Sequence, residues 1–153
     1  MAKTALNEKE RGKKIEEVFQ KALYCHVAFT DGQQPYVIPL SFGTLDGSLY
    51  FHAGLEGKKL RMLQENPKVS FALEHAVALQ EAKSACKFSM RYASVVGSGV
   101  ATILQDPQEK SLGLNVVVQH YGAGPEEYSA KALQSLSVVK VEIKEISYKE
   151  AHL

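Results

Sequence analysis

The chain has 153 residues, of which 45% are hydrophobic and 23% are charged, and its formal net charge is +1. This composition is typical of a single globular domain, here residues 1–153, and excludes a disordered chain. Because the charges nearly balance, no overall field attracts nucleic acid or a membrane surface, so we expect neither partner and only local anion binding.

The N-terminal stretch "MAKTALNEKERGKK" lacks the apolar core of a signal peptide, and no apolar run reaches the roughly 20 residues that span a bilayer. Cys25 and Cys86 fit no redox or metal spacing, and the five histidines show no ligand pattern. We therefore expect a reduced, cytoplasmic protein without a metal site.

A helix is predicted over about residues 7–22, because Asn7 and Glu10 have the spacing of a capping box. The residues that follow repeat at helical spacing and give one apolar face: Ile15, Val18, Phe19 and Ala22.

Three strands are predicted next, over residues 23–30, 36–45 and 48–53. The tight turns Asp31-Gly32 and Asp46-Gly47 join them, so we expect an antiparallel meander. Pro39 cannot donate to a strand ladder, which predicts an edge, a bulge or a ligand at that point.

The rest of the chain alternates helices and strands. A helix over about 56–65 precedes a strand at 68–74, and residues 75–85 read equally as a strand tail or a loop. A long strand over 89–104 contains Gly97 and Gly99, which predict a bend. A helix capped by Asp106, a short helix around 126–135 and a last strand over 137–149 complete the pattern. We expect a mainly β protein, a small antiparallel β-barrel of about six strands with added helices.

Two adjacent lysines, Lys58 and Lys59, stand at the predicted start of the 56–65 helix. The N-terminal end of a helix favours anions, so clustered cations there indicate a missing anionic partner. Gly54 and Gly57 would let a phosphate approach the backbone. The alternative is a solvated lysine pair on an exposed helix, which is the commoner arrangement in isolation.

Two further candidates carry weaker signals. Arg91, at the start of a strand with Ser94 close behind, could bind a phosphate or carboxylate with its planar fork, or be a surface arginine. His52 ends an apolar strand just before the glycine turn, where a histidine is either a structural residue or a proton donor.

The order "YVIPLSFG…SLYFHAGLEGKKLRMLQENPKVSFALE…CKFSMRYASVVGSGVATIL" resembles the FMN-binding split-barrel superfamily related to pyridoxamine 5′-phosphate oxidase. Within it, the chain is similar to the branch that includes the nitroimidazole-resistance (Nim) proteins. The resemblance covers about residues 11–145. It implies a six-stranded split barrel and a homodimer with FMN at the subunit interface.

The resemblance also implies which residues contact FMN. The second strand would lie along the isoalloxazine ring, Phe51 and His52 beside the flavin or substrate, and the following turn and helix start on the phosphate, with Arg91 and Ser94 completing that site. The implied cofactor residues are Tyr36, Val37, Ile38, Pro39, Leu40, Ser41, Phe51, His52, Glu56, Gly57, Lys58, Lys59, Arg91 and Ser94.

The leading functional hypothesis is an FMN-dependent oxidoreductase that takes a hydride from a nicotinamide and reduces a small molecule, with His52 as the catalytic candidate. Pyridoxamine phosphate oxidases carry a C-terminal segment with arginine and tryptophan, whereas this chain has no tryptophan and ends "SYKEAHL". We therefore do not expect genuine pyridoxamine phosphate oxidase activity. The alternatives are a flavin or haem carrier or sensor, with His52 or His120 as the axial ligand, and a dimeric scaffold without ligand.

Overall fold

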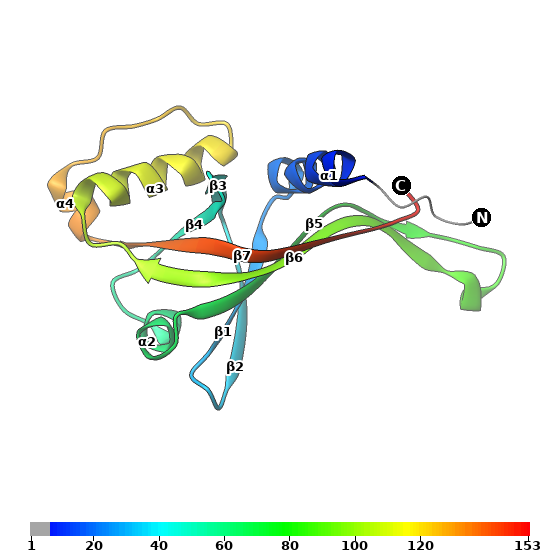
Figure 1. Cartoon of the computed structure of the whole chain (residues 1–153), viewed down its shortest axis with the longest axis horizontal. Helices are drawn as coiled ribbons and strands as arrows, with labels where there is room; N and C mark the ends of the chain where they lie inside the picture. Colours follow the sequence, from blue (N-terminus) through cyan, green and yellow to red (C-terminus); the bar gives the residue numbers. More distant parts are fainter. Residues whose placement is uncertain (1–6) are drawn as a thin grey trace.

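The computed structural model describes residues 7–153 as a mainly β protein with helices packed against one curved sheet (Figure 1). Residues 1–6, part of the stretch argued not to be a signal peptide, lie outside the described residues. Within residues 7–153, no helix has both the length and the apolar character needed to cross a membrane. The elements are α1 (Glu8–Lys21), β1 (Cys25–Thr30), β2 (Pro35–Leu40), β3 (Gly43–Leu45), β4 (Ser48–Ala53), α2 (Lys58–Glu65), β5 (Lys68–Gln80), the 3-10 helix η1 (Ala85–Lys87), β6 (Ser89–Ile103), α3 (Pro107–His120), α4 (Ala130–Gln134) and β7 (Ser137–Ala151).

The sheet is antiparallel throughout, in the order β2-β1-β5-β6-β7-β4-β3. β1 and β4 are not neighbours in this order, yet Phe29 of β1 meets Phe51 of β4 edge to face, with ring centroids 6.3 Å apart. The sheet therefore curls around a shared core, and the predicted fold class is confirmed. The strand number was wrong, because the described residues form seven strands and not six.

The extra strand arises where the predicted 36–45 strand divides at Ser41 and Phe42. Phe42 is fully buried, and its backbone N–H donates to the hydroxyl of Tyr121 in the loop after α3. A Cβ atom on Gly43 would lie 2.2 Å from the carbonyl oxygen of Val116, so only glycine allows this approach to α3. Between β2 and β3 the chain crosses from one edge strand of the sheet to the other, and these contacts hold the crossing point. Both predicted hairpins are present, β1–β2 and β3–β4 across the Asp46-Gly47 turn. The prediction of one continuous three-stranded meander was wrong, because β2 and β3 are separate strands at opposite edges of the sheet.

The two faces of β4 belong to different cores. Leu49, Phe51 and Ala53 point into the barrel interior. Tyr50 points the other way, into a second cluster formed with α3, α4 and Val138 of β7. This alternation follows from the two-residue period of a strand.

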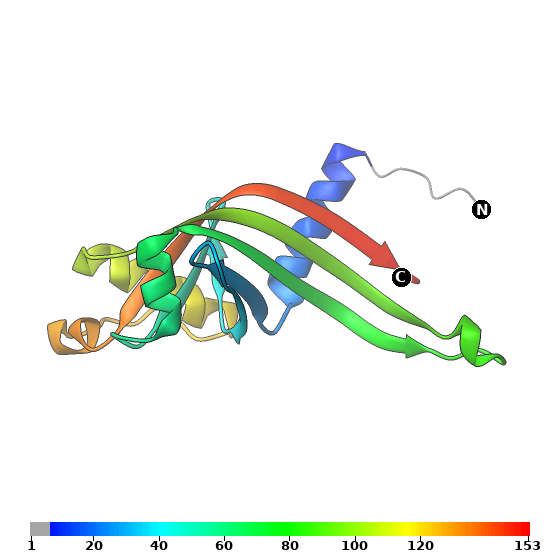
Figure 2. The ribbon, with the colours of Figure 1, turned by 90° about the horizontal axis from the view of Figure 1, so that it is seen from below.

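β5, β6 and β7 run on past the barrel as a long arm, with α1 packed on it (Figure 2). The ambiguous 75–85 segment is strand as far as Gln80, with a register shift between His75 and Ala78 and a positive φ of 55° at Ala76. A second register shift falls between Ser98 and Gly99, in the stretch for which the glycine pair predicted a bend. A Cβ on Gly99 would lie 2.3 Å from the carbonyl oxygen of Glu142, which explains the need for glycine there.

The helix boundaries follow the predicted caps. Asn7 and Glu10 form both hydrogen bonds of the capping box at α1. The Asp106 carboxylate accepts from the Glu109 N–H at α3, and Pro107 occupies the first turn. The short helix predicted around 126–135 covers only Ala130–Gln134. The Ser129 hydroxyl caps it by accepting a hydrogen bond from the Ala132 N–H.

Candidate functional site

The N-terminus of α2 has no side-chain cap. Gly57 precedes the helix with a φ of 137°, a conformation that L side chains rarely adopt, and the first turn contains no acidic residue. Its unpaired N–H groups and the partial positive charge of the helix end coincide with Lys58 and Lys59. This end of α2 therefore has the donors and charge that a phosphate group requires.

Lys58 connects α2 to the first β-hairpin. Its ammonium nitrogen lies 4.5 Å from the centroid of the Tyr36 ring on β2. The pKa of Asp31, in the turn before β2, is lowered chiefly by the backbone N–H groups of Gln34 and Gln33, and the charge of Lys58 acts in the same direction. Residues predicted separately, on the second strand and at the helix start, thus come together.

Within residues 7–153, β2 is an edge strand that pairs with β1 alone, so the edge is the one of the three alternatives predicted from Pro39 (edge, bulge or ligand) that the sheet order shows. Tyr36, Ile38 and Leu40 pack partly against the core, while Val37 and Pro39 are exposed on the other face. Ser41 follows, also exposed. The outer backbone edge of β2 is therefore open to a ligand beside the α2 N-terminus.

Phe51 and His52 lie on opposite faces of β4. The Phe51 side chain is fully buried in the barrel, so only its backbone could contact a ligand at the surface. His52 is the one exposed residue of β4, and its ring makes no hydrogen bond to any residue in 7–153. Glu56 is exposed in the turn between them and α2.

Arg91 and Ser94 are not brought to this site within one chain. α2 leads into Lys68, which pairs with Val100 of β6, whereas Arg91 pairs with Ala78 far along the arm (Figure 1). The stretch of β6 from Arg91 to Val100 spans about 30 Å. Strand alternation also puts Arg91 and Ser94 on opposite faces of β6, and the Ser94 hydroxyl donates to the carbonyl of Lys149.

Two residues at the end of α3 form a junction that the sequence did not indicate. The Tyr121 hydroxyl donates to the carbonyl of Leu23 at 2.8 Å while accepting from Phe42. His120 Nε2 donates to the carbonyl of Ala22 at 2.8 Å, and the ring packs on Phe42 with centroids 4.5 Å apart. His120 is thus held in a structural role, which weakens it as a haem ligand relative to His52. No sequence spacing could reveal bonds between residues 98 positions apart.

In the described residues, no group of three or more His, Cys, Asp or Glu side chains is arranged to hold a metal ion. The groups gathered at the candidate site are the cations Lys58 and Lys59, the backbone N–H groups at the start of α2, and the aromatic ring of Tyr36.

Comparison with known proteins assigns the fold and the family. The model of the pyridoxamine 5′-phosphate oxidase family matches residues 12–150. A Bacteroides thetaiotaomicron structure, described as a candidate 5-nitroimidazole antibiotic resistance protein, is 32% identical with a TM-score of 0.80, over 95% of this chain and 86% of that one. No match was found among curated proteins.

Two solved structures of lower identity share the fold. A flavocytochrome from Azotobacter vinelandii is 20% identical, with a TM-score of 0.78 over 98% of this chain and 74% of that one. An FAD- and haem-binding protein from Mycobacterium smegmatis is 18% identical, with a TM-score of 0.81 over 92% and 71%. Since the family model spans nearly the whole chain, the protein belongs to the pyridoxamine 5′-phosphate oxidase family.

Proposed function

We propose that the protein is an FMN-dependent oxidoreductase that acts on a small molecule with a nicotinamide as electron donor. The observation that carries the proposal is the start of α2, which is uncapped, free of acidic residues and doubly basic, and lies beside the open edge of β2. A phosphate monoester carries a charge near −2 and fits such a helix start. The flavin-binding relatives described above support the choice of a flavin.

The residues would divide the work of binding. Lys58 would turn from the Tyr36 ring to the phosphate, Lys59 and the N–H groups after Gly57 would hold its remaining oxygens, and the β2 edge would line the ring system. FMN when bound supplies hydride and electron transfer. The exposed His52 ring is free to donate a hydrogen bond or a proton to a bound substrate.

A homodimer is part of this proposal. The arm exposes large apolar side chains, among them Val77 (52%), Leu79 (54%), Phe88 (45%) and Met90 (44%). Apolar groups gathered on an extended sheet are typical of a surface that another chain covers. A second copy docked there could bring its Arg91 and Ser94 to the phosphate held by Lys58 and Lys59, which one chain alone cannot do.

The test is a visible absorption spectrum of the freshly purified protein, repeated on the supernatant after heat denaturation. FMN released on heating, followed by anaerobic bleaching with NADH or NADPH, is the expected result. A colourless protein that takes up no added FMN would contradict the proposal.

The second candidate is a flavin- or haem-binding protein without turnover. It is favoured by the exposed, unbonded ring of His52 and by fold neighbours that are described as a flavocytochrome and as FAD- and haem-binding. A Soret band in the same spectrum, or a bound flavin that neither nicotinamide reduces, would place this candidate first.

A further inference from the structure

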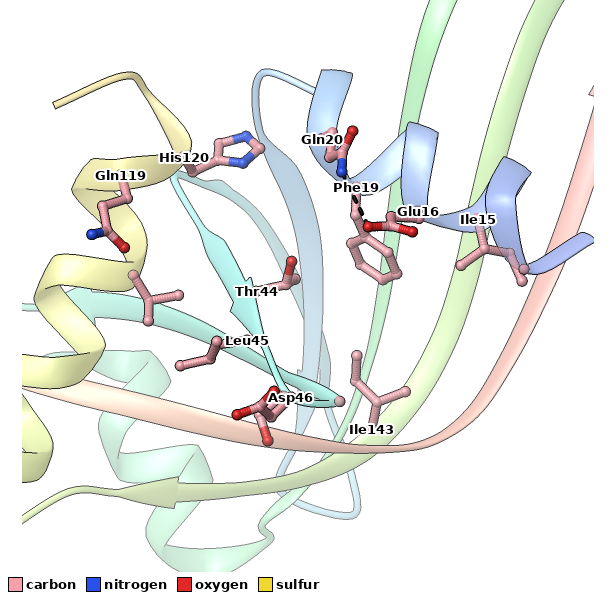
Figure 3. A pocket seen from close by; sticks show the side chains of 14 residues that line it. Ile15, Glu16, Phe19, Gln20, Thr44, Leu45, Asp46, Gln119, His120 and Ile143 are labelled. Carbon is pink, nitrogen blue, oxygen red and sulfur yellow. Dashed lines mark hydrogen bonds between the residues drawn. The ribbon is translucent and has the colours of Figure 1, made fainter. Parts of the chain in front are cut away.

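A pocket of about 510 Å³ lies between α1, α3 and the β3–β4 hairpin, on the side of the barrel away from α2 (Figures 1 and 3). We propose that it is a second binding site, for a small organic cation: an amine carried on an aromatic or aliphatic body. This site goes beyond the proposed flavin site and shares none of its residues.

The pocket has the size of a small-molecule site, since pockets that bind small ligands have volumes of about 300–1,000 Å³. Its lining is mixed, with apolar side chains beside charged and polar ones. The apolar part of the lining comes from Ile15 and Phe19 of α1, Val116 of α3 and Ile143 of β7. Figure 3 shows Ile15, Phe19 and Ile143 around the pocket. These side chains would cover the apolar body of the ligand.

Ser48 provides a polar group that the protein leaves unpaired. The residue is only 4% exposed, it lines the pocket, and its hydroxyl makes no hydrogen bond to any described residue. It lies on the same face of β4 as Tyr50, which points toward α3. No fully buried side-chain polar atom of the described residues lacks a partner, so the Ser48 hydroxyl is within reach of solvent in the pocket, and a ligand there could take that hydrogen bond from water.

Two carboxylates give the site its charge preference. Asp46 and Gly47 form the two-residue turn between β3 and β4 with φ values of 47° and 73°, and this turn places Asp46 in the lining of the pocket. Glu16 lies on the α1 wall, where the Gln20 amide donates to it at 3.2 Å (Figure 3).

No cation balances these carboxylates in the lining. Among the lining residues in 7–153 none is lysine or arginine, and His120 already donates Nε2 to Ala22. Opposite charge and a charge-assisted hydrogen bond therefore favour an ammonium group, which the Phe19 ring could also attract. The α2 site has the reverse charge, so the two sites would not compete for one ligand.

The probe is 2-phenylethylamine, compared with neutral 2-phenylethanol and anionic 3-phenylpropanoate. Each is titrated into the full-length, ¹⁵N-labelled protein, and its affinity is measured by calorimetry. We expect saturable amide shifts in residues 15–20, 44–48 and 116–120 with the amine, and much weaker effects with the other two compounds. Equal binding of all three, shifts centred elsewhere, or no saturable shift would overturn the proposal.

Variants locate the contribution of each group. Asp46→Asn should weaken amine binding by at least about tenfold, and Ser48→Ala by a few-fold, while Glu81→Gln on the distant arm should leave it unchanged. Glu16→Gln provides a second test of charge should Asp46→Asn disturb the turn. Thr44→Trp keeps both carboxylates but fills the space, so it should also abolish binding. An affinity unchanged in Asp46→Asn, Glu16→Gln and Thr44→Trp would overturn the site, and the flavin spectrum of each variant shows separately whether the cofactor site is intact.

Discussion

The ammonium nitrogen of Lys58 lies 4.5 Å from the ring centroid of Tyr36, and this contact joins the first residue of α2 to the edge strand β2. A cation over an aromatic ring at an exposed site contributes only about 0.5–1 kcal/mol. The contact is therefore weak enough for Lys58 to leave the ring when a phosphate binds nearby. Lys58 and Tyr36 therefore join the start of α2, where the phosphate of the flavin is proposed to bind, to the β2 edge, where its ring system is proposed to lie.

Replacing Lys58 and Lys59 together with alanine should weaken FMN binding by at least about tenfold, because each charged hydrogen bond contributes about 1.5–3 kcal/mol. The measurement is FMN affinity of the apoprotein by flavin fluorescence quenching. Lys9→Ala with Lys13→Ala, two exposed lysines of α1, is the matched control and should bind normally. Unchanged affinity in the first variant would mean that the lysine pair is a solvated surface feature.

Two lysines placed on the arm should separate the proposed dimer. Leu79 and Met90 are paired across β5 and β6 and both are exposed, so Leu79→Lys with Met90→Lys puts charge where apolar contact is proposed. Sedimentation should change from twice the 16.8 kDa chain mass to a single chain, with loss of FMN. Leu112→Lys, at an equally exposed leucine on α3, should remain dimeric. A wild-type protein that sediments as a monomer would rule out the dimer.

The substitution Gly43→Ala should lower the free energy of unfolding by about 1–3 kcal/mol, as expected for overpacking. The added Cβ would lie 2.2 Å from the Val116 carbonyl oxygen, and backbone atoms there cannot swing aside. Gly12→Ala is the control, because a Cβ on this α1 glycine meets nothing within 4 Å. It should raise stability by about 0.5–1 kcal/mol. Urea unfolding measures both, and equal shifts of the same sign would contradict the packing of β3 on α3.

Tyr121 is exposed, and substitutions at exposed residues usually change stability little, but removing the Tyr121 hydroxyl should destabilise the fold. Tyr121→Phe leaves the N–H of fully buried Phe42 without its partner, a cost of about 1–3 kcal/mol. Tyr24→Phe should change stability little, since the Tyr24 hydroxyl bonds to no described residue. Thermal unfolding of the two variants gives the comparison, and similar melting temperatures would show that the Tyr121 junction carries no stability.

Cys25 should be inert in the native protein. Burial raises the pKa of its thiol to about 12. In a Cys86→Ser variant, a thiol reagent at pH 8 should therefore find no reactive group until denaturant is added, and then one. Rapid modification of the native variant would show that β1 opens readily.

The same shift predicts a loss of stability in alkali. The pKa of the Cys25 thiol is 9.0 in the unfolded chain and about 12 in the folded chain, so the folded chain holds the proton to a higher pH. Between pH 9 and 12 the Cys25 thiol stays protonated in the folded chain but loses its proton in the unfolded chain, so rising pH favours the unfolded chain. The contribution of Cys25 to the free energy of unfolding is therefore complete below pH 9 and is lost between pH 9 and 12. The slope from this one group is at most about 1.4 kcal/mol per pH unit. Urea unfolding across this range, compared with a Cys25→Ser variant, should show a shallower slope in the variant.

The helix caps and the local clusters of charge could be predicted from the amino-acid pattern alone. The capping box of α1, the Asp106 cap of α3 and the basic start of α2 all depend on residues within a few positions of one another. Hydrogen bonds inside one turn and the two-residue period of a strand need no distant partner, so the pattern of the chain reveals them.

The way in which those helices and strands pack together could not be predicted from the amino-acid pattern. The break at Phe42 depends on Tyr121, and the contact of Lys58 with Tyr36 depends on how α2 packs beside the first hairpin. The same holds for the separation of Arg91 from Lys58, which follows from the register of β5 on β6. Such long-range contacts are set by side-chain packing and sheet order, which the period of a single segment does not encode.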